Sequence, residues 1–453
     1  MTVLHDTEGG GRGTDRHVGI LFVASPLFSE SAAKDLVGRT KALAESGALQ
    51  GSLRVAGTLA RDRASCAEAL RSLDLESLDG LIVQLSTFCT AELLHELLAH
   101  IGHRSIPLAL WALEEDSEIV TNSLCGAQLW GSTLSRFGRR FSLLVGNPDD
   151  PRIARDLAAF AAASRALAKI TGARVALIGA HAEWFTNLAV DPWALKQALG
   201  VTIEQTTLLR FLEGCKAEER AEKAAAMRWA GARFDGGDEE NGRHTLGSTY
   251  ARLEAGLERI AADAIAIRDW PEILYAPEFR GTWGALGELS DRAVPIAPEG
   301  DVMGAVTALA IRGFDAASLP FLTDISGLDR ANNRLVLWHY GVSPRLADGT
   351  RWLDSVLKQE SFSLKAGPMT LLRLSLRNDG KLRIFVAEGE IEAEHPKANR
   401  AAGYFRPSGM EAEAFVRRFI EQGYEHHVTA VYGHWADATL HLGRQLGVEV
   451  DHA

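Results

Sequence analysis

The sequence predicts an α/β protein with two doubly wound α/β domains followed by a β-rich carboxy-terminal domain. From His17 to about residue 330, short apolar runs alternate with longer amphipathic runs. This alternation is typical of parallel sheets covered by helices on both faces. Beyond Leu335, runs of β-forming residues follow one another more closely, which favours antiparallel strands. A chain of 453 residues is too long for one core, so we expect about three domains.

The first domain is expected over residues 17–150. Its strands are predicted at 17–23, 51–58, 80–85, 107–112 and 141–145. Helical spacing of apolar residues marks 31–49 and 64–73. Residues 1–16 are polar and rich in glycine, without the apolar segment that a signal peptide requires. We therefore predict a short disordered leader over residues 1–16.

The second α/β domain is expected over residues 151–330, where the pattern restarts after an Ala-rich helix at 151–171. Strands are predicted at 173–179, 201–205 and 264–268, and helices at 192–199, 216–230 and 245–262.

The third domain is expected over residues 331–453. Its strands are predicted at 334–338, 369–376, 382–388 and 428–432. The sequence Asn378-Asp379-Gly380 is a hairpin signal between the second and third of these strands. Two late helices are predicted at 411–422 and 435–446.

Net charge and cysteine content indicate which partners and which cellular compartment the protein is expected to have. A net charge of -11 argues against a nucleic-acid partner and against an anionic membrane surface. The apolar stretches are too short to cross a bilayer. Cys66, Cys89, Cys125 and Cys215 show neither CxxC spacing nor a disulfide framework. We expect reduced, structural thiols and a cytoplasmic protein.

Four predicted strand ends carry side chains that can bind a metal. Glu299 follows the apolar run 294–297, Asp324 follows 319–322, His339 follows 334–338, and His427 precedes 428–432. In open α/β sheets, functional groups gather at the carboxyl ends of strands. Two carboxylates and two imidazoles suit Mn²⁺, Co²⁺ or Fe²⁺, with open positions for a sugar hydroxyl and carbonyl. We therefore consider a divalent metal site, with Mn²⁺ as the first candidate.

Each of these residues also has a structural interpretation. A carboxylate at a strand end is commonly a helix cap or a solvated loop residue, and Asp301 fits a cap before the helix 302–311. A lone histidine is more often hydrogen-bonded than a ligand, and His426 and His427 would point to opposite faces of a strand. The sequence has no GxSxG elbow, and its glycine-rich segment precedes a strand rather than following one.

The same residues resemble the L-fucose isomerase / L-arabinose isomerase superfamily. The resemblance is dense from Trp270 onward and is carried by five segments: Arg268-Asp269-Trp270-Pro271-Glu272, Asp291-Arg292-Ala293-Val294-Pro295, Glu299-Gly300-Asp301-Val302-Met303-Gly304-Ala305, Leu335-Val336-Leu337-Trp338-His339-Tyr340-Gly341 and Glu425-His426-His427-Val428. At the position of Asp324 the fucose branch of the superfamily has Asp and the arabinose branch has Glu, so Asp324 resembles the fucose branch. His339, in contrast, matches a histidine ligand of the arabinose branch.

The resemblance implies that Glu299, Asp324, His339 and His427 bind the metal. It also implies that Glu299 and Asp324 are the acid–base pair of an aldose–ketose isomerase. Such an enzyme would act on a pentose or deoxyhexose through an enediol, and its third domain would be barrel-like. Segments 86–88 and 122–126 resemble loops that reach a neighbouring subunit's site, which implies a homo-oligomer. The alternatives are a non-catalytic sugar-binding or regulatory protein, and a metal-dependent epimerase or lyase of a sugar derivative.

Overall fold

A computed structural model describes residues 17–49, 51–102, 104–116, 118–234, 238–354, 359–397 and 399–453. The predicted leader, residues 1–16, lies outside these ranges. The chain forms two compact units, one up to residue 165 with 444–447, the other spanning 166–443 with 448–453. Each unit is described by itself.

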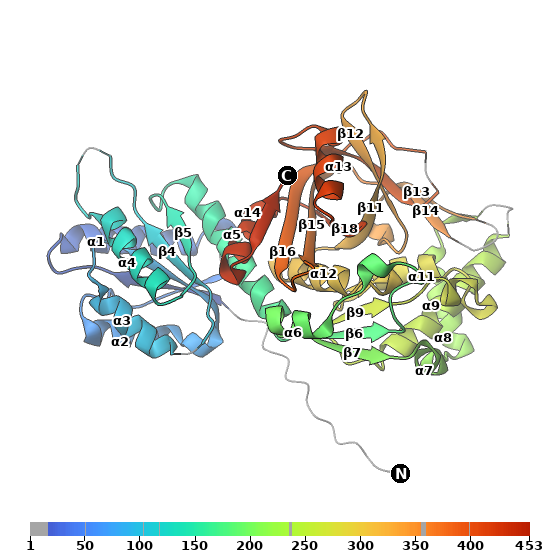
Figure 1. Ribbon diagram of the computed structural model, residues 1–453, viewed down its shortest axis with the longest axis horizontal. Coiled ribbons are helices and arrows are strands. Elements are labelled where there is room, and N and C mark those ends of the chain that lie inside the picture. Colours follow the sequence, from blue (N-terminus) through green and yellow to red (C-terminus); the bar gives the residue numbers. More distant parts are fainter. Residues whose placement is uncertain are drawn as a thin grey trace, which may run out of the picture. The chain divides into compact units, whose positions relative to one another are not determined.

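The first unit is built on a five-stranded parallel sheet with the order β2-β1-β3-β4-β5, a doubly wound order (Figure 1). Its strands are β1 (His17–Val23), β2 (Leu53–Val55), β3 (Leu78–Leu85), β4 (Leu108–Ala112) and β5 (Ser142–Val145). The helices are α1 (Glu30–Ala44), α2 (Arg63–Leu73), α3 (Ala91–Ile101), α4 (Ser123–Arg136) and α5 (Pro151–Ile170). All five helices contribute apolar side chains to one core around the sheet.

The second unit begins with a smaller parallel sheet with the order β10-β9-β6-β7. Its strands are β6 (Arg174–Ile178), β7 (Thr202–Thr206), β9 (Ala264–Ile267) and β10 (Ile296–Ala297). The helices of this portion are α6 (Pro192–Leu199), α7 (Leu208–Gly214), α8 (Glu219–Ala226), α9 (Glu239–Leu257), α10 (Glu272–Tyr275), α11 (Thr282–Leu289) and α12 (Val302–Phe314).

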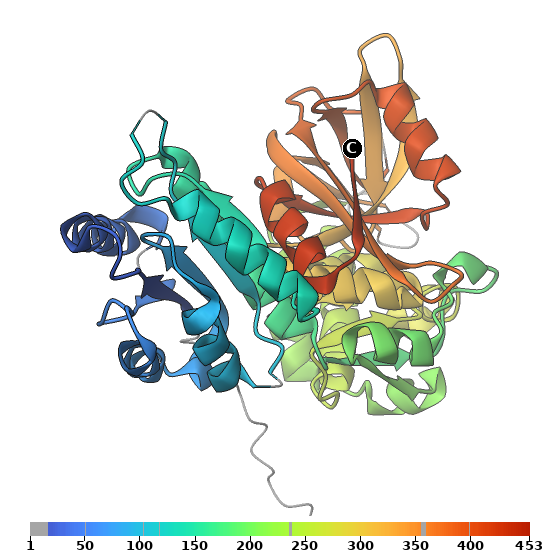
Figure 2. The same ribbon diagram turned by 60° about the vertical axis from the view of Figure 1, so that its left-hand side comes forward.

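A closed barrel forms the rest of the second unit (orange to red in Figures 1 and 2). Its ring runs β16-β15-β18-β11-β12-β17 and closes through the pairing of β16 with β17. These strands are β11 (Phe321–Asp329), β12 (Arg334–His339), β15 (Gly367–Leu376), β16 (Leu382–Ile391), β17 (Ala401–Pro407) and β18 (His427–Tyr432). Four more strands extend the sheet: β8 (Arg233–Phe234), β13 (Ala347–Leu353), β14 (Glu360–Leu364) and β19 (Glu449–His452). The helices α13 (Ala412–Glu421) and α14 (Ala436–Leu446) follow β17 and β18.

Helix α12 joins the small sheet to the barrel. All of its residues are buried, and it contacts both β9 and β15. A helix that is apolar all round is expected between two layers rather than at a surface. The turn that leads into α12 is thereby fixed between the two sheets.

The predicted architecture is confirmed, including the barrel-like third portion. The hairpin at Asn378-Asp379-Gly380 joins β15 to β16, with Gly380 at a positive φ of 75°. Two details of the predicted architecture were wrong. Asp324 lies inside β11 rather than at a strand end, because the ladder with β12 continues past it to Asp329. The segment 122–126 begins helix α4 instead of forming a loop.

The structure bears on two further predictions. Among the described residues, no helix combines the length and apolarity that a membrane span requires. All four cysteines are free thiols, and three of them are buried. Burial raises the pKa of Cys66, Cys89 and Cys215 to about 12, so these thiols are protonated and unreactive.

Candidate metal centre

Glu299 lies in a short turn, Pro298–Gly300, between β10 and α12. Its backbone is left-handed, with φ 60°. Its N–H donates to Asp269 Oδ1 at 2.7 Å, and its carbonyl accepts from the N–H of Ala182 at 2.8 Å. A Cβ on Gly300 would lie 2.1 Å from the carbonyl oxygen of Ala180, so glycine is required there. The strained turn therefore fixes the direction of the buried Glu299 side chain.

Three adjacent barrel strands supply the other predicted ligands. Asp324 in β11 is directly opposite His427, the first residue of β18, in the antiparallel register. On the other side, Asp324 pairs with Trp338, so His339 follows at the last position of β12. Residues opposite each other in antiparallel strands have neighbouring side chains. The register therefore places Asp324 beside His427, and His339 joins them from the last position of β12.

The four predicted residues meet at one point. The Nε2 atoms of His339 and His427 are 3.2 Å apart. His427 Nε2 is 3.2 Å from Glu299 Oε2 and 3.9 Å from Asp324 Oδ1. Both of these carboxylate oxygens are buried and have no hydrogen-bond partner.

Buried polar atoms are nearly always paired, so two unpaired oxygens beside two imidazole nitrogens need an explanation. A divalent cation would satisfy all four atoms, and mixed N and O donors suit a transition metal such as Mn²⁺. The described residues include two overlapping groups able to hold a metal ion, one of Asp324, His339 and His427, the other of Glu299, His426 and His427. The donor set therefore fits a divalent metal.

The opposite nitrogen of each imidazole is held by a second group. His427 Nδ1 is 3.0 Å from Asp301 Oδ2, and His339 Nδ1 is 2.7 Å from the carbonyl oxygen of Tyr340. Both acceptors require a proton on Nδ1, so in the neutral imidazole the lone pair lies on Nε2, the atom at the shared point. This is the usual arrangement of metal-binding histidines.

Asp301 has two roles, of which the sequence analysis found one. It caps α12, accepting from the N–H of Gly304 at 2.8 Å as predicted. It also orients His427 and binds the buried Arg373, whose Nη1 and Nη2 donate to it at 2.6 and 3.0 Å. Arg373 in turn lies 3.3 Å from Glu425 Oε2. Three charged side chains in series, Asp301, Arg373 and Glu425, thus hold His427 at its Nδ1 side.

Electrostatics follow from this packing. Burial raises the pKa of Glu299, but the nearby imidazoles of His426 and His427 outweigh this effect and lower the pKa overall. Burial lowers the pKa of His427, yet Asp301 and Glu299 raise it to about 9. Burial lowers the pKa of His339. The centre therefore contains ionised carboxylates that attract positive charge.

Two aromatic residues support Glu299 through its other carboxylate oxygen, Oε1. The Tyr340 hydroxyl donates to Glu299 Oε1 at 2.7 Å, and its ring stacks on Trp283 with centroids 3.6 Å apart. Trp283 Nε1 donates to Asp269 Oδ2 at 2.7 Å. Because Tyr340 holds Oε1, Oε2 is the oxygen of Glu299 that faces the shared point. Sequence reasoning missed these contacts, although Tyr340 follows His339 directly.

His426 also faces the centre, contrary to the expectation of opposite faces. It precedes β18, so strand alternation does not apply, and its Nε2 lies 3.5 Å from Glu299 Oε2. Its Nδ1 is 2.9 Å from Asn187 Nδ2, and its ring meets Phe185 edge-on. The side chain is 37% exposed, whereas His427 is fully buried. His426 therefore lies between the centre and solvent.

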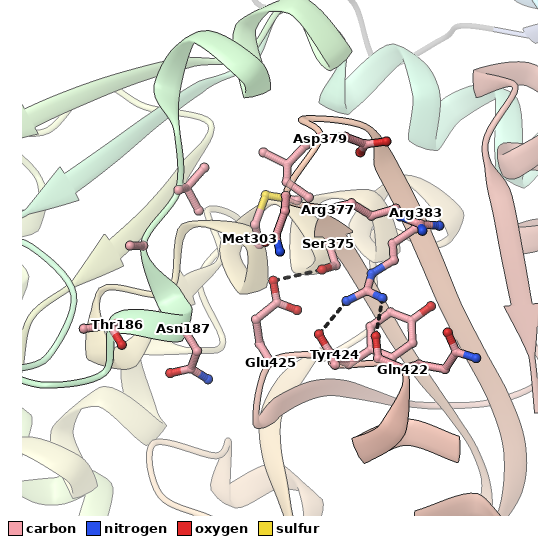
Figure 3. Close-up of a pocket in the computed structure, with 15 residues that line it drawn as sticks. Thr186, Asn187, Met303, Ser375, Arg377, Asp379, Arg383, Gln422, Tyr424 and Glu425 are labelled. Atoms are coloured by element: carbon pink, nitrogen blue, oxygen red, sulfur yellow. Dashed lines mark hydrogen bonds between the residues drawn. The ribbon is translucent and has the colours of Figure 1, made fainter. Parts of the chain in front are cut away.

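A pocket of about 600 Å³ lies next to this entrance (Figure 3). Asn187 and Glu425 line it, and Glu425 Oε1 accepts from the Ser375 hydroxyl at 2.9 Å. Arg383 donates to the backbone carbonyls of Gln422 and Gly423, both at 2.6 Å. The polar groups shown in this pocket are largely used to hold the turn before His426.

The segments 86–88 and 122–126 lie in the first unit. The N–H of Phe88 donates to the carbonyl of Thr121 at 2.7 Å, and the Ser123 hydroxyl donates to the carbonyl of Leu85. The two segments are therefore adjacent, beyond the carboxyl end of β3. Their contact with a neighbouring subunit, which the resemblance implies, stays a prediction.

Comparison with known proteins agrees with this description. Residues 361–453 match the family model described as L-fucose isomerase, C-terminal domain. Sulfoquinovose isomerases from Priestia aryabhattai and Priestia megaterium (strain ATCC 12872 / QMB1551) are each 24% identical over 401 residues, covering 84% of this chain and 86% of theirs. The sulfoquinovose isomerase of Clostridium sp. (strain MSTE9) is 26% identical, covering 84% and 87%.

These similarities confirm the predicted enzyme class, an aldose–ketose isomerase. The same findings support the predicted superfamily, that of L-fucose isomerase and L-arabinose isomerase.

Proposed function

We propose that this protein is a metal-dependent aldose–ketose isomerase that acts on a small sugar through an enediol intermediate. The observation that carries the proposal is the convergence of two unpartnered carboxylate oxygens on two imidazole Nε2 atoms. Glu299, Asp324, His339 and His427 would hold the metal, with Mn²⁺ the first candidate. When bound, a divalent metal would polarise the sugar carbonyl and stabilise negative charge that develops on its oxygen.

The carboxylates would move the proton between carbons. One of Glu299 and Asp324 removes the proton from C2 of the open-chain aldose, and the C2–H electron pair forms the double bond of the enediol. The proton returns at C1, while the hydroxyl proton of O2 moves to O1, so the product is the ketose isomer. Tyr340 positions Glu299 for this step by binding Oε1.

The substrate class follows from the relatives. On sequence grounds the candidate substrates are pentoses and deoxyhexoses, and the similar proteins are named sulfoquinovose isomerases. Sulfoquinovose is a deoxyhexose whose terminal carbon carries a sulfonate. We therefore place a deoxyhexose, with sulfoquinovose first, ahead of a pentose.

We also propose a homo-oligomer whose sites are completed across an interface, in the cytoplasm. The exposed apolar side chains Leu27, Ile119, Val120 and Leu124 support the first point, because they neighbour the segments 86–88 and 122–126. The free thiols support a reducing compartment.

Isotope exchange tests the reaction. Mn²⁺-loaded protein would be incubated in D₂O with sulfoquinovose, unsubstituted deoxyhexoses, pentoses and tetroses. We expect deuterium at C1 of the ketose product from the preferred sugar, and EDTA should abolish the exchange until Mn²⁺ is restored. Turnover that EDTA leaves unchanged in protein shown to be metal-free would refute the metal-dependent mechanism.

A further inference from the structure

Arg400 lies immediately before β17, and its guanidinium makes no ion pair with any residue that the structure describes. Nη1 donates to the carbonyl of Asn399, and Nε is buried with no partner. Asp354 and Tyr340 influence it only through longer-range charge interactions.

Other buried or half-buried arginines of the same unit have more acceptors. Arg334, Arg351 and Arg373 each bind at least two carboxylates. Arg312 instead donates to three backbone carbonyls, those of Ala316, Ser290 and Arg292, although its Nε also has no partner. A partly buried guanidinium normally requires such acceptors, since removing it from water is costly. Arg400 therefore has unused capacity to bind an anion.

Its location is next to the metal centre. Ala401, the following residue, pairs with His339 across the β17–β12 ladder. The guanidinium carbon lies 5.1 Å from the centroid of the Trp283 ring, which stacks on Tyr340. Tyr340 in turn donates to Glu299. Arg400 is thus separated from Glu299 by a single aromatic pair.

Arg400 also lines a pocket of about 270 Å³ between β13, β14 and β17. The pocket carries hydroxyl groups from Thr350, Ser361 and Ser363. It contains one carboxylate, Asp348, which lies 3.3 Å from His395 Nε2. Hydroxyls beside a guanidinium fork are the donors that bind sulfonate or phosphate oxygens.

We propose that Arg400 recognises an anionic terminal group of the sugar, a sulfonate or a phosphate, and so determines the substrate class. This inference rests on the proposed isomerase function, because it assumes that the carbonyl end of the same sugar lies at the metal centre. Burial lowers the pKa of Arg400, and a bound anion would offset that destabilisation of the charge.

Specificity ratios test the proposal. For each variant, kcat/KM would be measured with sulfoquinovose, with glucose 6-phosphate and with 6-deoxyglucose, which has the same carbon chain without the charge. Replacing Arg400→Gln should lower the ratio of anionic to neutral kcat/KM about 10- to 100-fold, mainly through KM, as expected for losing a charged hydrogen bond. Arg400→Lys should restore part of the ratio. The two anionic substrates show whether sulfonate or phosphate is preferred.

Arg417→Gln is the matched control, since Arg417 is 66% exposed and pairs only with Glu413 among the described residues. It should leave the ratio unchanged. Equal losses for charged and neutral sugars in Arg400→Gln, with the metal content of the wild type, would overturn the proposal.

Calorimetric binding of sulfoquinovose and 6-deoxyglucose to the Mn²⁺-loaded protein separates this proposal from the proposed function. If no sugar is turned over, the isomerase proposal fails, yet loss of sulfoquinovose binding in Arg400→Gln would still support anion recognition. If the wild type isomerises sugars but Arg400→Gln keeps the same binding preference, only the role of Arg400 fails.

Discussion

Two buried carboxylates of the second unit, Glu299 and Glu360, each have an oxygen without a hydrogen-bond partner. Glu299 faces His426 and His427, which lower its pKa despite burial. Glu360 shares Arg351 with Glu288, and burial raises its pKa to about 7. The same unsatisfied atom thus occurs in opposite electrostatic settings.

This difference shows what defines the candidate metal centre. An unpaired carboxylate oxygen is not sufficient, because the Glu360 cluster offers no imidazole and is not among the metal-competent groups of the described residues. At Glu299, histidine lone pairs and carboxylate oxygens point at one position. Divalent transition metals favour this combination of carboxylate oxygens and neutral imidazole nitrogens.

The largest expected difference between the two carboxylates appears when the negative charge of each is removed in turn. Glu299→Gln should bind metal poorly and lose activity by about 1000-fold or more, because it removes both a ligand and a candidate base. Glu360→Gln should retain metal and turnover. Metal analysis and kinetic assays on both folded variants decide the point. Comparable turnover in Glu299→Gln and wild type would contradict the assignment.

A smaller effect on metal affinity is expected from Asp301, which contacts the candidate ligand His427 rather than the metal position itself. Asp301→Asn should weaken metal affinity about 10- to 100-fold, because Asp301 fixes the orientation of His427. Asp191→Asn is the control, since Asp191 caps helix α6 through the N–H groups of Trp193 and Ala194. Competition with a chelator measures both affinities. If the two variants lose affinity equally, the loss reflects helix capping rather than histidine orientation.

The smallest expected effect concerns pH and stability. Burial raises the folded-state pKa of Glu360 to about 7, above the usual glutamate value of 4.5, so the folded state favours the protonated acid. Its contribution to stability is therefore full below pH about 4.5 and declines as pH rises through 7. Relative to wild type, Glu360→Gln should flatten this decline by on the order of 1 kcal/mol in denaturant titrations of metal-free protein. Parallel pH profiles for the two proteins would rule out this role.

Much of the fold was predictable because apolar periodicity is local. Strands such as β3 and β9 are nearly continuous apolar runs, and the Asn378-Asp379-Gly380 turn marks its hairpin unambiguously. Strands β13, β14 and β17 were not predicted, since their alternation is irregular. The polar strand β7 was predicted only because it follows a helix at the right spacing.

The four candidate ligands of the site could be predicted from the sequence, but the residues that hold these ligands in place could not. Glu299, Asp324, His339 and His427 occupy recognisable segments, whereas Arg373 and Arg400 carry no local signal. Asp301 caps α12 in a manner readable from sequence, but its contact with His427 joins residues 126 positions apart. Such contacts depend on barrel register, which single-segment patterns do not encode.

The place of β18 in the barrel has a consequence for synthesis on the ribosome. It pairs with β11 on one side and β15 on the other, yet it is the last strand of the ring to emerge. Until residues 427–432 are made, both neighbours present open edges, which favour association between nascent chains. The same strand carries His427, so a chain released before residue 427 would lack both the barrel closure and the last candidate metal ligand. A chain that binds the metal would therefore be one whose synthesis had passed His427.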